Sequence, residues 1–239
     1  MFFVTGHGRS GTVFLSDLLA KSKNGHVFHE SAFLDQDLFV EAFRGRTELS
    51  SDRLKLIETR QRQQPNLIYG EVNGYLRYWA PFLLTLTPDV FHLVRNGKDV
   101  IRSMFNRNAI SFTKRDKNRT RFIYPTGNDP YTEKWEEMPR FERLCWYWQH
   151  GVAKLLSENI PVIQFEQVLK SYEYLQDHLL TPTGLELNFD VWEYEHRILK
   201  NETSQQRLVF PKYEGWSKRQ QQSFKDICGD AMEACGYEI

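Results

Sequence analysis

Residues 2–12 read Phe2-Phe3-Val4-Thr5-Gly6-His7-Gly8-Arg9-Ser10-Gly11-Thr12, a short apolar run that leads into a loop with three glycines. The apolar run predicts a buried strand over residues 2–5. Leu15, Leu18 and Leu19 then follow at helical spacing, which predicts a helix over residues 12–21. A glycine loop between a strand and a helix can direct consecutive backbone N–H groups at an anion, and the helix dipole adds to the attraction. The sequence therefore predicts a P-loop-like phosphate-binding loop after the first strand.

The alternation of strands and helices continues along the chain. Further strands are expected at residues 27–29, 67–69, 90–94 and 162–165. Further helices are expected at residues 34–44, 51–63, 75–86, 99–105, 140–158, 167–179, 189–199 and 217–234. Such alternation indicates an α/β protein of three layers, with a parallel sheet covered by helices on both faces. We expect a single domain over residues 1–239, with ligands bound beyond the carboxyl ends of the strands.

Composition and charge argue against several classes of protein. The chain has 239 residues, with 31 Lys and Arg against 31 Asp and Glu, so it has no net charge to attract nucleic acid or an anionic membrane. Its longest apolar run, residues 79–84, is far shorter than the roughly 20 residues that span a bilayer. No basic region precedes an apolar stretch at the N-terminus, and the 3 cysteines lack metal-ligand spacing. We expect a cytoplasmic protein with no metal site, no nucleic-acid partner and no integral membrane segment.

Three known patterns fit the glycine loop. As Gly6-x-Gly8-x-x-Gly11 it has the spacing of dinucleotide-binding folds, and Glu30 lies at about the distance where those folds place an acid on the ribose. As Gly6-x4-Gly11 it is similar to a Walker loop, but Thr12-Val13 stands where a nucleotide hydrolase has Lys and Ser or Thr. The third interpretation is a tight turn whose glycines only permit packing. The first two patterns leave unexplained why Arg9-Ser10, a guanidinium and a hydroxyl, stands at the tip of the loop.

A second candidate anion site follows the strand at residues 90–94. Arg95 ends that strand, and the next helix carries Asp99, Ser103 and Arg107 at intervals of four residues, so these three share one helix face. The fork of N–H donors on Arg95 suits a phosphate, and Ser103 can point to the same edge of the sheet. The alternative is that Arg95 forms a surface salt bridge with Asp99 and that Ser103 is an ordinary helix hydroxyl.

The two segments together resemble the signature sequences of sulfotransferases that use 3′-phosphoadenosine 5′-phosphosulfate (PAPS). The loop with Arg9 is similar to that of the carbohydrate and tyrosylprotein branches. The resemblance implies that the first loop binds the 5′-phosphosulfate and that Arg95 and Ser103 bind the 3′-phosphate. Further similarity lies in residues 141–146, 165–168 and 212–216. The nucleotide-binding residues that this comparison implies are Gly8, Arg9, Ser10, Gly11, Thr12, Val13, Arg95, Ser103, Arg107 and Lys212.

Sulfuryl transfer between oxygens needs a base for the acceptor and a cation for the leaving phosphate, and it needs no metal. Arg9 is the predicted cation. Glu30 is the first candidate for the base, because the resemblance places a glutamate about twenty residues beyond the loop arginine. His29 is a neighbour that orients Glu30 or substitutes for it. Glu71, which also follows a predicted strand, is the third candidate.

The sequence thus predicts a sulfotransferase with PAPS as co-substrate. The acceptor is a hydroxyl or an amine, and a carbohydrate, a lipid, a tyrosine and a small molecule all stay open. The principal alternative is an oxidoreductase that binds NAD(P) or FAD through Gly6-x-Gly8-x-x-Gly11 and Glu30. A nucleotide-binding protein without catalysis is a further alternative.

Overall fold

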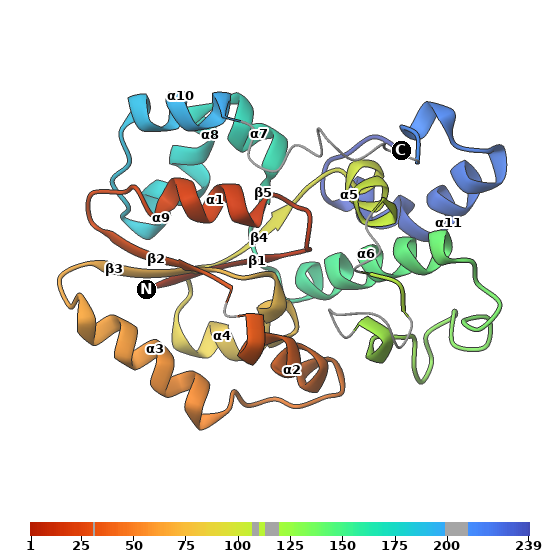
Figure 1. The fold of residues 1–239 in the computed structure, drawn as a ribbon, viewed down its shortest axis with the longest axis horizontal. Coiled ribbons are helices and arrows are strands. Elements are labelled where there is room, and N and C mark those ends of the chain that lie inside the picture. The colour runs from red at the N-terminus through yellow and green to blue at the C-terminus, as the bar shows by residue number, and fades with distance from the viewer. Residues whose placement is uncertain (31, 107–109, 113–119, 199–209) are drawn as a thin grey trace.

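A computed structural model describes residues 1–30, 32–106, 110–112, 120–198 and 210–239. Its centre is a sheet of five parallel strands in the order β2-β3-β1-β4-β5 (Figure 1). The strands are β1 (Phe2–Gly6), β2 (Gly25–His29), β3 (Ile68–Val72), β4 (Val90–Val94) and β5 (Val162–Gln164). All five were expected from the sequence. Strands β1 and β4 are buried along their whole length, as their apolar runs predict for the middle of a parallel sheet.

Helices cover both faces of the sheet, which confirms the three-layer α/β architecture (Figure 1). One face carries α1 (Thr12–Leu19), α7 (Phe165–Lys170), α8 (Tyr172–Leu175), α9 (Thr181–Thr183) and α10 (Phe189–Arg197). The other carries α2 (Ala32–Phe43), α3 (Ser51–Gln63) and α4 (Ala80–Leu86). At the right of Figure 1 lie α5 (Gly97–Phe105), α6 (Arg140–Ser157) and α11 (Lys218–Ala234). The apolar side chains of these helices and of the sheet form three buried clusters, and α2 and α6 each contribute to two of them.

Two of the expected helices are divided. Residues 75–86 form a 3₁₀ turn, η1 (Gly74–Trp79), followed by α4, because the Asn73 side chain caps the turn and Pro81 suits only the first turn of a new helix. Residues 167–179 divide at Ser171, whose extended backbone ends α7 and whose hydroxyl accepts from the Tyr174 N–H to begin α8. Helix α8 continues into a π-helical turn, Gln176–Leu180. Shorter 3₁₀ turns are Thr120–Phe122 and Tyr213–Gly215.

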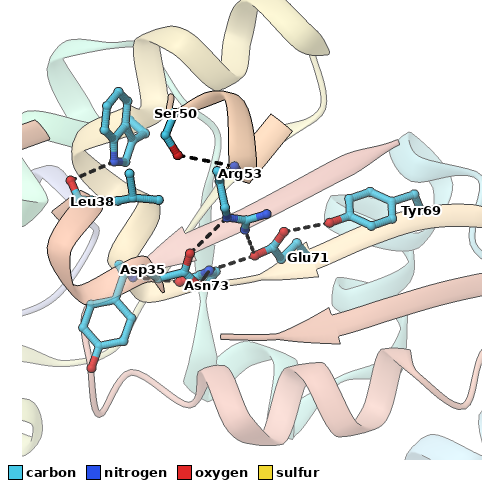
Figure 2. A network of polar contacts seen from close by, with 9 residues as sticks. Asp35, Leu38, Ser50, Arg53, Tyr69, Glu71 and Asn73 are labelled. Carbon is cyan, nitrogen blue, oxygen red and sulfur yellow. Dashed lines mark hydrogen bonds and ion pairs between the residues drawn. The ribbon is translucent and has the colours of Figure 1, made fainter. Parts of the chain in front are cut away.

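A buried ionic cluster joins α2 and α3 to the sheet (Figure 2). The guanidinium of Arg53, in α3, pairs with Asp35 in α2 at 3.0 Å and with Glu71 in β3, and none of the three side chains is exposed. The Tyr69 hydroxyl and the Asn73 amide each donate to Glu71 at 2.8 Å. Burial alone raises the pKa of a carboxyl, but the charge of Arg53 and these hydrogen bonds hold the pKa of Glu71 below its ordinary value. The cluster therefore favours the ionised carboxylate.

We predict that Arg53→Met lowers the free energy of unfolding by about 3–5 kcal/mol, because the substitution leaves two buried carboxylates without their cation. Arg62→Met is the matched control, since Arg62 lies on the same helix in an exposed pair with Glu58 and its loss should change stability by less than about 0.5 kcal/mol. Urea denaturation measures both. Because the pKa of Glu71 is lowered in the folded protein, its contribution to the free energy of unfolding is complete above the ordinary pKa of a glutamate. That contribution is lost as the pH falls through the lowered pKa.

The difference between wild type and Arg53→Met should therefore be largest near neutral pH and should shrink in acid. Equal losses for the two arginine variants at neutral pH would contradict this account of the cluster.

Candidate functional site

The loop after β1 has a backbone shape that few residues adopt. Arg9 and Gly11 both have positive φ angles, 78° and 94°, and Gly11 is the N-cap of α1. A side chain at Gly11 would overlap the ring of Phe165, so glycine is required there both by conformation and by space. The Ser10 N–H donates to the His7 carbonyl at 3.1 Å, which closes the turn. The sequence and the local packing together fix this loop in one conformation.

The start of α1 offers unsatisfied donors. No side chain caps this helix, so the N–H groups of its first turn lack the partner that a cap supplies. The Ser10 hydroxyl is buried and has no hydrogen-bond partner among the described residues. Val13, in the same turn, is 38% exposed. The predicted residues Gly8, Arg9, Ser10, Gly11, Thr12 and Val13 thus form a continuous loop and helix start that suit an anion.

The second candidate anion site directly contacts this loop. Arg95 follows β4, and the Asn96 side chain accepts from the Lys98 N–H at 3.0 Å to begin α5. From α5, the Ser103 hydroxyl accepts a hydrogen bond of 3.0 Å from Nε of Arg9. Arg95 donates to the Arg9 carbonyl at 3.4 Å. The salt bridge between Arg95 and Asp99, which was the alternative interpretation of this segment, exists as well, with the charged atoms 3.9 Å apart on a partly exposed surface.

Residues at the end of β5 hold the two segments together. Phe165 packs against Gly11, and the guanidinium of Arg95 lies 5.6 Å from the centre of the same ring. The Glu166 carboxylate accepts from the Asn96 N–H at 2.9 Å and from the Tyr237 hydroxyl at 2.6 Å. The Phe165-Glu166 pair therefore fixes the spacing between the first loop and the start of α5.

The two leading candidates for the base lie beside the loop. Glu30 is half-buried, and its carboxylate accepts from the Gly74 N–H at 3.2 Å. Burial raises the pKa of Glu30 above the ordinary value, while the charge of His29 and the Gly74 N–H act in the opposite direction. Nε2 of His29 lies 3.5 Å from the Thr12 hydroxyl. A carboxylate with a raised pKa next to a candidate anion-binding loop is well suited to accept a proton.

The other predicted site residues are placed differently. Glu71 is fully buried in the Arg53 cluster, and this enclosure argues against its role as the third candidate base. Lys212 is exposed and precedes the turn at Tyr213, whose ring is covered by Nζ of Lys98 at 4.3 Å, so its segment lies against α5. Arg107 lies outside the described residues.

A buried cation that was not predicted from the sequence lies behind the site. Arg77 donates to the Gly74 carbonyl at 2.8 Å and to the Tyr147 hydroxyl at 2.7 Å. The Tyr147 carbonyl bonds Nε2 of His7, whose pKa is lowered well below the ordinary value by burial and by the charge of Arg77. The pKa of His92, in β4, is lowered to about 3 for the same reasons. Both histidines are therefore neutral at physiological pH, and nothing in the pattern of single residues signals these contacts.

This chain is similar to known proteins in its fold more than in its sequence. No protein-family model and no curated protein sequence matches it. A solved structure of similar fold is a sulfotransferase from Alicyclobacillus acidocaldarius, which is 13% identical to this chain. The match has a TM-score of 0.51 and covers 100% of this chain and 96% of that one. The chain thus has a sulfotransferase-like fold. No helix among the described residues has the length and apolar character needed to cross a membrane.

We predict that Gly11→Ala lowers the free energy of unfolding by about 2 kcal/mol or more, because a positive φ and an overlap with Phe165 each cost about 1–3 kcal/mol. Gly8→Ala is the matched control in the same loop. A side chain at Gly8 meets nothing within 4 Å, and its φ is not in the positive range. Its effect should stay within about 0.5 kcal/mol. Thermal or urea unfolding measures both, and equal stability of the two variants would refute the packing role of Gly11.

Proposed function

We propose that this protein is a sulfotransferase that moves a sulfuryl group from PAPS to a hydroxyl or an amine of an acceptor. The observation that carries the proposal is the hydrogen bond of 3.0 Å between Arg9 and Ser103. Two candidate phosphate sites that are 94 residues apart in sequence meet side by side, as a nucleotide with phosphates on both sides of one ribose requires. Glu30 lies next to the first of them, through its bond to Gly74. The sulfotransferase-like fold supports the same proposal.

The residues divide the chemistry between them. Glu30 accepts the proton of the acceptor as the acceptor oxygen attacks sulfur in line with the bridging oxygen of the 5′-phosphate. As the bond from sulfur to that bridging oxygen breaks, Arg9 and the first N–H groups of α1 stabilise the charge that builds on the leaving phosphate. Arg95 and Ser103 hold the 3′-phosphate and thereby orient the donor. The products are a sulfated acceptor and 3′,5′-ADP.

The remaining nucleotide contacts of the proposal come from the resemblance. Lys212 and Arg107 are proposed to bind the nucleotide, and His29 is proposed to assist Glu30. PAPS is a co-substrate here, and the acceptor stays open among carbohydrates, lipids, tyrosines and small molecules. Among the described residues, no group of three or more His, Cys, Asp and Glu side chains is arranged to hold a metal ion.

The order of the sheet disfavours the oxidoreductase alternative. Dinucleotide-binding folds have the strand order 3-2-1-4-5-6, in which the acid on the ribose ends the strand next to β1. Here β3 lies between β1 and β2, so Glu30 follows a strand that does not neighbour β1. Its carboxylate is instead bonded to the Gly74 N–H. This position suits a group that faces the acceptor better than one that binds the ribose.

We predict that Glu30→Gln keeps its affinity for PAPS and loses turnover by about 10²–10⁴-fold, since the substitution preserves shape and removes basicity. Glu58→Gln, an exposed glutamate on α3, is the control and should be as active as wild type. The assay follows sulfate release from PAPS or transfer to a generic phenol, with nucleotide affinity measured by calorimetry.

Three results would count against the proposal. A loss of nucleotide binding in Glu30→Gln would favour the oxidoreductase, and the absence of turnover in wild type would favour a protein that only binds nucleotide. Full activity of Glu30→Gln, with loss of activity in His29→Ala, would assign the base to His29.

A further inference from the structure

The carboxamide of Asn73 is buried and its hydrogen-bonding groups are occupied (Figure 2). Nδ2 donates to Asp35 and to Glu71, both at 2.8 Å, and Oδ1 accepts from the Tyr75 N–H at 3.0 Å. Its backbone N–H donates to the Val4 carbonyl in β1 at 2.8 Å. Two carboxylates require donors and one N–H requires an acceptor, so this orientation of the amide is the one that satisfies all three. Asn73 is thereby held through both its side chain and its backbone.

The same side chain fixes the first turn of η1. Because Oδ1 caps that turn, it sets the direction of the neighbouring Gly74 N–H, which donates to Oε1 of Glu30 at 3.2 Å. A side chain placed at Gly74 would come within 3.1 Å of the Gly6 carbonyl and 3.2 Å of Glu30. The backbone of Gly74 therefore packs directly between Glu30 and the loop after β1.

The ionic cluster makes this arrangement rigid. Arg53 holds Asp35 and Glu71 in place, and these two carboxylates are the groups to which Asn73 donates. Asp35 lies in α2, five residues after Glu30. Helix α2, which follows Glu30, and turn η1, whose Gly74 N–H donates to Glu30, thus both contact the same buried cluster.

We propose that Asn73 is the positioning residue of the candidate base: its carboxamide couples the Asp35–Arg53–Glu71 cluster to η1 and so aims the Gly74 N–H at the Glu30 carboxylate. The assignment rests on the proposed function, in which Glu30 accepts the proton of the acceptor. It adds to that function a group that touches neither nucleotide nor acceptor and acts through the backbone of its neighbour.

The expected effect on titration follows from the groups that face Glu30. These are His29 from β2, Asp35 from α2, and Tyr75 and Arg77 from η1. Burial and Asp35 raise the pKa of Glu30, whereas His29, the Gly74 N–H and Arg77 lower it. Replacing Asn73 by another neutral residue changes none of these charges. A shift in the pKa of Glu30 would then report a change in its hydrogen bond from the Gly74 N–H.

The test compares Asn73→Ala, which removes the cap, with Asn73→Ser, which keeps a hydroxyl acceptor for the Tyr75 N–H. Carbon NMR of labelled side-chain carboxyls follows the titration of Glu30 in the protein without nucleotide, and Glu30→Gln assigns the signal. We expect a higher pKa for Glu30 in Asn73→Ala and a smaller shift in the same direction in Asn73→Ser. The control is Ser171→Ala, which removes the cap of α8 and should leave the pKa of Glu30 unchanged.

A purely structural role for Asn73 would lower stability without moving this pKa. An unshifted Glu30 in the folded Asn73→Ala variant overturns the proposal, and Asn73→Ser decides in the same way if Asn73→Ala does not fold. Kinetics give the second readout: turnover with PAPS should fall on the order of 10- to 100-fold in Asn73→Ala with KM for PAPS unchanged. Wild type without turnover would defeat the proposed function, while the NMR titration would still decide whether Asn73 positions Glu30.

Discussion

The candidate site depends on one constraint, which is that β1 lies between β3 and β4 in a sheet whose strands all run in the same direction. The loop after β1 therefore meets the segments that follow both neighbours at one edge of the sheet. Gly74 comes from the β3 side, and Arg95 comes from the β4 side. The outer strands add Glu30 after β2 and Phe165 after β5. Strand order and the common direction of the strands therefore bring residues from five parts of the chain to one edge.

Buried charge gives this edge its electrostatic character. Arg77 lies within η1 and Arg53 lies between two carboxylates, and both guanidiniums are enclosed by protein. Desolvation makes such groups costly unless every charge has a partner, which is why Asp35 and Glu71 accompany Arg53. The same burial keeps His7 and His92 neutral and raises the pKa of Glu30. The buried guanidiniums, the two neutral histidines and the Glu30 carboxyl with its raised pKa together define the charge at this edge of the sheet.

Much of the fold follows from local sequence patterns. The apolar runs predicted all five strands, and the helical pattern of residues 51–63 predicted α3. The glycine loop and the position of Arg95 predicted two anion sites, and the structure brings them together through Arg9 and Ser103. These features can be predicted from the sequence because each depends on residues that are close together in the chain.

Other features depend on contacts between distant residues. Arg53 lies on a helix that is otherwise strongly polar, so its complete burial against Asp35 and Glu71 has no local signal. The ion pair of Glu71 also has no local signal, since a position near a strand end is equally typical of a catalytic carboxylate and of a buried ion pair. The 3₁₀ turn after Asn73 was predicted as part of a longer helix, because apolar spacing does not distinguish the two. The role of Asn73 could be recognised only from the structure, which shows its side-chain hydrogen bonds to Asp35, Glu71 and Tyr75.

The central claim is that the first loop and the pair Arg95 and Ser103 bind one nucleotide through two phosphates on opposite sides of its ribose. Calorimetric titration of the wild-type protein with 3′,5′-ADP, 5′-AMP and NAD, in the presence of EDTA, tests it most directly. The account predicts that 3′,5′-ADP binds at least about tenfold more tightly than 5′-AMP, because hydrogen bonds to a charged phosphate contribute about 1.5–3 kcal/mol, and that NAD does not bind. Binding of NAD without binding of 3′,5′-ADP would contradict it.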